Sequence, residues 1–179
     1  MNMFGQRSYP FYKFGDVLFL ERIPIEYWQE YIQQRFKQAE KHISATFVED
    51  IYSYVDGNSS YVQQLSWLVW MRTENEVSEE IITDAKQELL RQNHALFMEQ
   101  INSLTLYQIR FIRAIMAGKA QEVNRKETIE EFELGSSANV ATIKKALQKK
   151  ELIEIEGKQI YFSDPIFIHW LHLNSQLFA

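Results

Sequence analysis

Between residues 24 and 103 the apolar residues recur in four stretches at the spacing of amphipathic helices. Pro24 favours the start of the first helix, and Ser44 is a suitable N-cap for the second. Asp56-Gly57-Asn58 separates the second helix from the third, and Ser78 caps a long fourth one. The apolar positions of the four helices are Trp28, Tyr31, Ile32 and Phe36; Phe47, Val48, Ile51, Tyr54 and Val55; Tyr61, Val62, Leu65, Leu68 and Val69; and Ile82, Ala85, Leu89, Leu96, Phe97, Ile101 and Leu104. The pattern predicts a four-helix lobe over residues 24–103.

Residues 104–179 continue with three shorter helical patterns. Thr105 and Gln108 form a capping box ahead of an apolar helix with Leu106, Ile109, Ile112 and Met116 on one face. A short second helix is expected over residues 127–134, and Gly135 ends it. Ser136-Ser137 can then open a third helix, whose apolar face carries Val140, Ile143 and Leu147.

Two short apolar runs follow the third helix. Residues 152–155 and 159–162 are separated by Glu156-Gly157-Lys158, which is typical of a β-hairpin. Three helices followed by a hairpin predict a winged-helix domain over residues 104–179. Such a module reads DNA or docks on another protein domain, and it is not catalytic.

The first 23 residues do not follow the helical pattern. Residues 8–15 are aromatic and aperiodic, and Val17-Leu18-Phe19-Leu20 is a continuous apolar run typical of a buried strand. No second strand lies nearby in the sequence to pair with this one. We therefore interpret residues 1–23 as an arm and a single strand, the edge of a larger sheet that is otherwise missing. The overall fold class is mainly α.

The balance of charge argues against a dedicated nucleic-acid-binding protein. The chain of 179 residues has 19 Lys and Arg against 24 Asp and Glu, which gives a net charge of −5. Neutralisation of phosphates supplies most non-specific affinity for DNA, so an acidic chain starts at a disadvantage. The third helix of the winged helix is the local exception, because it carries four lysines and no acid. Contact with DNA or a partner is expected there, at Lys144, Lys145, Lys149 and Lys150.

Composition also indicates in which cellular compartment the protein is expected. The sequence has no cysteine, which excludes disulfides and thiolate metal sites and fits a reducing cytoplasm. No apolar run approaches the roughly 18 residues of a membrane-spanning helix. We expect a cytoplasmic protein without a membrane partner.

No catalytic arrangement is visible in the sequence. A phosphate-binding P-loop needs a glycine-rich turn that ends in Gly-Lys-Ser/Thr, but Gly118-Lys119 is followed by Ala120 and fits the end of a helix. His169 and His172 could share a face of a C-terminal helix, yet no carboxylate joins them to complete a metal site. We therefore expect no catalytic residue and no metal ligand in this chain.

Aromatic residues recur along the first three predicted helices. They can form the core of the helical lobe, or they can form a platform on which bases stack. The helical spacing favours the core interpretation for the whole set, which consists of Trp28, Tyr31, Phe36, Phe47, Tyr52, Tyr54, Tyr61, Trp67 and Trp70.

Several stretches, taken in order, resemble the C-terminal part of the archaeal-type P-loop ATPases of the AAA+/STAND class, which are also widespread in bacteria. In that class an αβα nucleotide-binding domain is followed by a small helical lid and a winged helix. The resemblance covers nearly the whole chain, and its order and spacing are more specific than any single motif. The matching stretches are residues 10–15, 17–23, 57–65, 104–115, 134–137 and 164–171.

The resemblance implies a function for several residues. Gly57 to Leu65 corresponds to the lid motif, so Ser59, Ser60 and Tyr61 are expected to face the edge of a nucleotide, with Lys13 as a weaker candidate. Relatives have a proline where Ser59 stands and often an arginine where Lys13 stands, and both differences weaken nucleotide contact. ATP and Mg²⁺ would be held by the missing P-loop domain, and this chain alone would not hydrolyse ATP.

Two further functions stay open beside the ATPase switch. The chain could be a DNA-binding winged-helix regulator whose helical lobe dimerises or senses a ligand, or a module that only binds proteins. The lysine-rich helix favours the DNA regulator, and the acidic net charge opposes it.

Overall fold

The computed structural model describes residues 22–178, and residues 22–24 lead into the first helix without regular structure. The predicted arm and strand span residues 1–23. All of them except residues 22 and 23 lie outside the described part, and so does Lys13. Within the described part the chain folds into eight α-helices, a two-stranded sheet and a terminal 3₁₀ turn. None of these helices is both long enough and apolar enough to cross a membrane.

The helical lobe contains the four helices that the sequence predicts. They are α1 (Ile25–Gln38), α2 (Ala45–Tyr54), α3 (Ser59–Arg72) and α4 (Glu79–Asn102). The predicted N-caps of α2 and α4 are confirmed, because the side chains of Ser44 and Ser78 each accept a hydrogen bond from a backbone N–H in the first turn. Asn58 caps α3 in the same way. These caps satisfy N–H groups that a helix start would otherwise leave unpaired.

The winged-helix part follows in the predicted order. It consists of α5 (Leu106–Met116), α6 (Lys126–Glu131), α7 (Ser137–Lys149), β1 (Ile153–Glu156), β2 (Gln159–Phe162), α8 (Phe167–Leu173) and the 3₁₀ turn η1 (Ser175–Phe178). The Thr105–Gln108 capping box is present. The strands pair antiparallel, with Ile153 opposite Phe162 and Ile155 opposite Ile160. The mainly α fold class is therefore confirmed.

One predicted boundary is wrong. The second helix of this part was expected to reach residue 134, but α6 ends at Glu131. Glu133 has a φ of 50°, and the Leu134 N–H bonds back to the Ile129 carbonyl at 2.8 Å. A left-handed residue here closes the helix early, before Gly135 is reached.

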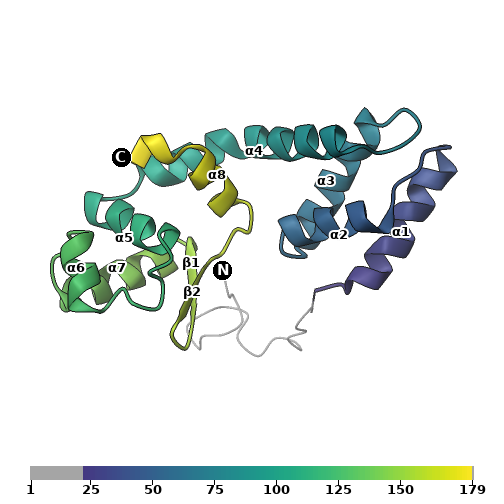
Figure 1. The fold of residues 1–179 in the computed structure, drawn as a ribbon. Helices are drawn as coiled ribbons and strands as arrows, with labels where there is room; N and C mark the ends of the chain where they lie inside the picture. The colour runs from purple at the N-terminus through teal and green to yellow at the C-terminus, as the bar shows by residue number, and fades with distance from the viewer. Residues whose placement is uncertain (1–21, 179) are drawn as a thin grey trace, which may run out of the picture.

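Helix α4 connects the two halves of the molecule. Its 24 residues make it about 36 Å long, and it packs against α3 at one end and α8 at the other. Figure 1 shows α1–α3 at one end of this helix and the winged helix at the opposite end. The residues buried on α4 include Leu89, Phe97 and Ile101, and they belong to one apolar core that both halves share.

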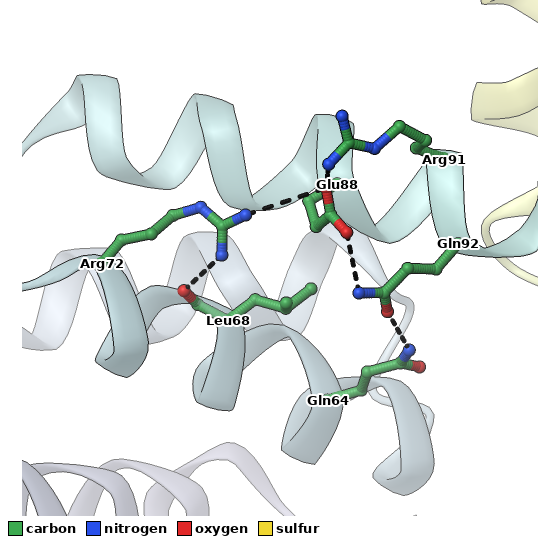
Figure 2. Close-up of polar contacts among 6 residues, drawn as sticks. All are labelled: Gln64, Leu68, Arg72, Glu88, Arg91 and Gln92. Atoms are coloured by element: carbon green, nitrogen blue, oxygen red, sulfur yellow. Dashed lines mark hydrogen bonds and ion pairs between the residues drawn. The ribbon is translucent and has the colours of Figure 1, made fainter.

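A polar network holds α3 to α4 on the outside of this core (Figure 2). Glu88 accepts a hydrogen bond from the Gln92 amide at 2.9 Å and forms an ion pair with Arg91. Gln64 of α3 donates to Gln92 at 2.9 Å, and the Arg72 guanidinium lies 3.8 Å from the Glu88 carboxylate. The hydrogen bond from Gln92 and the nearby guanidinium groups lower the pKa of Glu88, so this carboxylate stays charged.

The prediction that the aromatic residues all serve the core is wrong for two of them. Trp28 and Phe36 are buried, but the side chains of Tyr31 and Trp67 are 46% and 56% exposed. Both lie at the groove between α1 and α3. Helical spacing identified which residues share a side of each helix, but it could not tell whether a third element covers that side.

The shared core gives a testable prediction at the centre of the α4–α8 contact. Phe97 is fully buried, with its ring 5.1 Å from Phe167 and 5.6 Å from Trp170. We expect Phe97→Ala to lower the free energy of unfolding by about 3–5 kcal/mol, measured by urea denaturation. The matched control is Leu96→Ala, because Leu96 is 49% exposed and should change stability by no more than about 0.5 kcal/mol. Equal losses for the two variants would contradict this account.

Candidate functional site

The helical lobe and the winged-helix part meet at a seam formed by Tyr54 and Tyr61 on one side and Asp164 and His169 on the other. The Tyr61 hydroxyl donates to Asp164 Oδ2 at 2.7 Å, although 103 positions separate the two residues. The other oxygen of Asp164 accepts the backbone N–H of Ile166 at 3.0 Å. This carboxylate therefore joins the first turn of α3 to the segment that leads into α8.

The environment keeps the Tyr61 hydroxyl in its donating form. Burial raises the pKa of Tyr61, and the hydrogen bond to Asp164 together with the charge of Asp164 raises it further. A hydrogen bond from a neutral donor to a charged acceptor contributes about 1.5–3 kcal/mol. The Tyr61–Asp164 pair is therefore the strongest single polar contact that we identify across the seam.

A second contact lies where α2 meets α8. The His169 ring stacks on Tyr54, with 4.1 Å between centroids and 12° between planes. His169 Nε2 lies 3.0 Å from the Tyr54 carbonyl oxygen, which can only accept, so Nε2 carries the proton. Lys86 of α4 lies over the same Tyr54 ring at 4.7 Å and pairs with Asp50 at 2.8 Å. Burial lowers the pKa of His169, with smaller contributions from the charges of His172 and Lys86, and burial raises that of Tyr54 to about 12.

The first turn of α3 carries the three residues that the resemblance assigns to a nucleotide edge. Asn58 Oδ1 accepts the Tyr61 N–H at 3.3 Å and fixes the start of the helix. Gly57 precedes it at a φ of +65°, and a Cβ there would lie 2.7 Å from the Tyr52 ring. Glycine is therefore required by both conformation and space. Ser59 is half-buried, Ser60 is exposed and Tyr61 is half-buried.

A polar cleft of about 710 Å³ opens beside this turn. Ser60 and Tyr61 line it from the helical lobe, whereas Ser59 does not. On the winged-helix side the charged lining residues are Lys150, Glu151, Glu154 and Asp164. Three carboxylates against one lysine disfavour a phosphate group here.

The four lysines of the predicted partner surface differ in exposure and in their contacts. Lys145 and Lys149 are exposed on α7. Lys144 is half-buried, and burial lowers its pKa. Lys150 turns back to the end of α4, where its Nζ lies 3.2 Å from the Ser103 carbonyl and 3.1 Å from the Ser103 hydroxyl. The cations that α7 presents to an incoming partner are therefore Lys145 and Lys149.

The winged-helix part carries carboxylates as well as lysines, and two of them, Glu154 and Glu156, line clefts that Asn58 of the helical lobe also lines. The first strand of the wing carries Glu154 and Glu156, and the turn before α7 carries Glu133, which pairs with Arg110. The sequence could have indicated this, since acids outnumber lysines over residues 126–164. Within residues 22–178 no group of three or more His, Asp or Glu is placed to hold a metal ion.

The seam histidine gives a prediction about pH. In the unfolded chain His169 titrates near 6.5, whereas burial lowers its pKa in the folded protein. As the pH falls through about 6.5, His169 takes up a proton in the unfolded chain but stays neutral in the folded chain. The free energy of unfolding therefore decreases as the pH falls. We expect His169→Phe, which keeps a stacking ring, to lose less stability between about pH 7.5 and pH 5.5 than the parent protein, measured by urea denaturation. An unchanged pH dependence would show that His169 does not contribute to it.

Comparison with known proteins agrees with the fold of the C-terminal half. Residues 95–173 match the model of a family described as a probable winged helix domain. Searches among curated proteins and among solved structures gave no match. The matched range begins inside α4 and ends with α8, so it includes the α4–α8 contact as well as the helices and hairpin between them. This part of the chain is a winged-helix domain.

Proposed function

We propose that this chain is the lid and winged-helix part of an ATP-driven switch of the AAA+/STAND class. A P-loop domain, on the same polypeptide or on a partner, would hold ATP and Mg²⁺ and carry out any hydrolysis. The present chain would contribute no catalytic residue. Its task would be to convert the nucleotide state into a movement of the winged helix against a partner.

The hydrogen bond between Tyr61 and Asp164 is the observation that carries this proposal. Ser60 and Tyr61 stand at the start of α3, where the resemblance places the nucleotide edge, and Tyr61 is bonded directly to the winged-helix segment. A displacement of this turn by nucleotide would therefore strain or break a contact between the lobes. The strength of such a bond matches the 1–3 kcal/mol typical of coupling between sites.

The shape of α4 supports the same function. A single long helix that packs on α3 at one end and on α8 at the other moves as a rigid element. The Tyr61–Asp164 hydrogen bond is a single polar contact, and we expect nucleotide to act on it while the apolar α4–α8 contact stays closed. A movement that begins at α3 would then reach α7 on the far side of the winged helix.

The coupling can be tested with two spin labels, since the sequence has no cysteine of its own. Labels at Gln34→Cys on α1 and Ala141→Cys on α7 occupy exposed positions in the two lobes. We expect Tyr61→Phe to broaden the distance distribution between the labels, measured by pulsed electron spin resonance, because it removes only the hydroxyl that bonds Asp164. Tyr107→Phe is the matched control, since Tyr107 is 45% exposed on α5, away from the seam. Identical distributions for Tyr61→Phe and the parent would contradict the coupling.

A test of the nucleotide role uses the natural assembly, which is purified through a tag on the spin-labelled chain. We expect that assembly to contain a P-loop domain and to turn over Mg·ATP. We also expect the label distance to differ between Mg·ADP and a slowly hydrolysed ATP analogue, and Tyr61→Phe to remove most of that difference. An assembly with no P-loop domain and no response to nucleotide would overturn the proposed function.

A second function, DNA binding, is favoured by the exposed face of α7. That face consists of small residues, Ala138, Ala141 and Thr142, followed by Lys145 and Lys149, and small side chains allow a helix to approach the bases closely. The acidic net charge of −5 opposes this function, because neutralisation of phosphates supplies much of the affinity for DNA.

Salt dependence separates the two functions. A DNA reader should bind random duplex at low salt and lose about tenfold or more of its affinity at physiological salt, measured by fluorescence anisotropy. Lys145→Glu with Lys149→Glu should then abolish binding, whereas Lys126→Glu with Lys158→Glu, an equal charge change outside α7, should leave most of it. We expect the parent chain to bind duplex weakly at either salt concentration. Steep, α7-dependent binding would favour the DNA regulator instead.

A further inference from the structure

A groove of about 500 Å³ runs between α1 and α3, in the helical lobe at the end of the molecule away from the winged helix (Figure 1). Its walls are mainly aromatic and include three of the four tryptophans of the chain, Trp28, Trp67 and Trp70. A volume of this size, with aromatic walls and a few polar groups, is typical of a site for a small molecule. The groove shares no residue with the seam or with the polar cleft.

Two lining residues carry buried hydrogen-bond donors without a partner among residues 22–178. Trp28 and Ser66 are 4% and 8% exposed, and Trp28 Nε1 and the Ser66 hydroxyl are both closed off from solvent. A serine inside a helix can donate to the carbonyl four residues earlier, as Thr73 does to Val69 at 2.8 Å. Ser66 does not do so. An indole N–H can only donate, and both atoms are closed off behind the wall of the groove, so neither contacts a molecule in the groove with the side chains as they stand.

The charge of the groove indicates which kind of ligand it would bind. Arg35 is the one charged residue that lines it, and no carboxylate does so among the described residues. Its guanidinium lies 5.1 Å from the centroid of the Tyr31 ring and donates to the Gln38 side chain at 3.2 Å, and no ion pair forms with it in the described part of the chain. Guanidinium groups bind carboxylates through two parallel hydrogen bonds. In an acidic protein, a groove with one cation and no acid is complementary to an anion.

We propose that this groove binds a small planar aromatic carboxylate. The rings of Trp67 and Trp70 would pack on its aromatic body, and Arg35 would hold its carboxylate. The inference is independent of the proposed ATPase function, because it uses different residues at the other end of the helical lobe.

Two other occupants fit the same observations less well. The apolar face of a partner helix supplies no acceptor, since the carbonyls of a helix are bonded within the helix. A second copy in a twofold arrangement would bring another Arg35 to the same patch without a carboxylate to pair with it.

The probe for this proposal is 2-naphthoate, with the neutral 2-naphthamide as its matched comparison. We expect the intact chain to bind 2-naphthoate at least about tenfold more tightly than the amide, measured by calorimetry. Amide shifts in heteronuclear NMR spectra should be confined to α1 and α3. Equal binding of the two probes, no binding of either, or shifts on other elements would overturn the proposal.

Variants identify the residues responsible. Arg35→Gln should remove the preference for the carboxylate, whereas Lys37→Gln, which removes a charge from an exposed position on the same helix, should leave it unchanged. Trp67→Ala should weaken both probes, and because Trp67 is 56% exposed the fold should survive, as checked by circular dichroism.

Self-association supplies an independent check. If the groove were an interface between copies, the chain would dimerise in sedimentation experiments and Trp67→Ala would make it monomeric. If an amphipathic helical peptide bound while 2-naphthoate did not, the groove would be a helix-binding site. Either result would contradict the proposal.

Discussion

Burial of one face of α4 is the constraint on which the rest of the structure depends. Leu89 is buried in the half that packs on α3, and Phe97 in the half that packs on α8, so one helix contributes to both halves of the core. Because this contact is apolar and close-packed, it resists small rearrangements. The polar seam from Tyr61 to Asp164 is not constrained in this way. The molecule therefore joins its two halves by a close-packed apolar contact and, separately, by a polar one.

That combination explains why the seam is a better candidate for function than the lysine-rich helix. Tyr61 belongs to the first turn of α3 and bonds directly to Asp164, so it participates in both lobes. The exposed lysines of α7 belong to a chain with a net charge of −5, which reduces its attraction for phosphate. The groove between α1 and α3 is a separate feature, in which Arg35 stands beside exposed Trp67 and no carboxylate of the described residues lines the walls.

Much of the local structure could be predicted because it depends on neighbours in the sequence. Ser44, Ser78 and the Thr105–Gln108 box cap helices through contacts three residues away, and Gly157 lies in a two-strand hairpin whose strands alternate. The end of α6 was predicted wrongly because Glu133 adopts a left-handed conformation, which glycine favours and which glutamate rarely takes.

The sequence by itself determined the succession of helices and hairpin, the winged-helix order and the acidic balance, because periodicity, caps and charge are local or additive. Only the tertiary structure decided that Tyr61 meets Asp164, that Lys150 turns back to Ser103, and that Trp67 stays exposed while Trp28 is buried. These outcomes depend on how helices cross in space. The helical period fixes which side chains share a face, but it does not fix which element that face will meet.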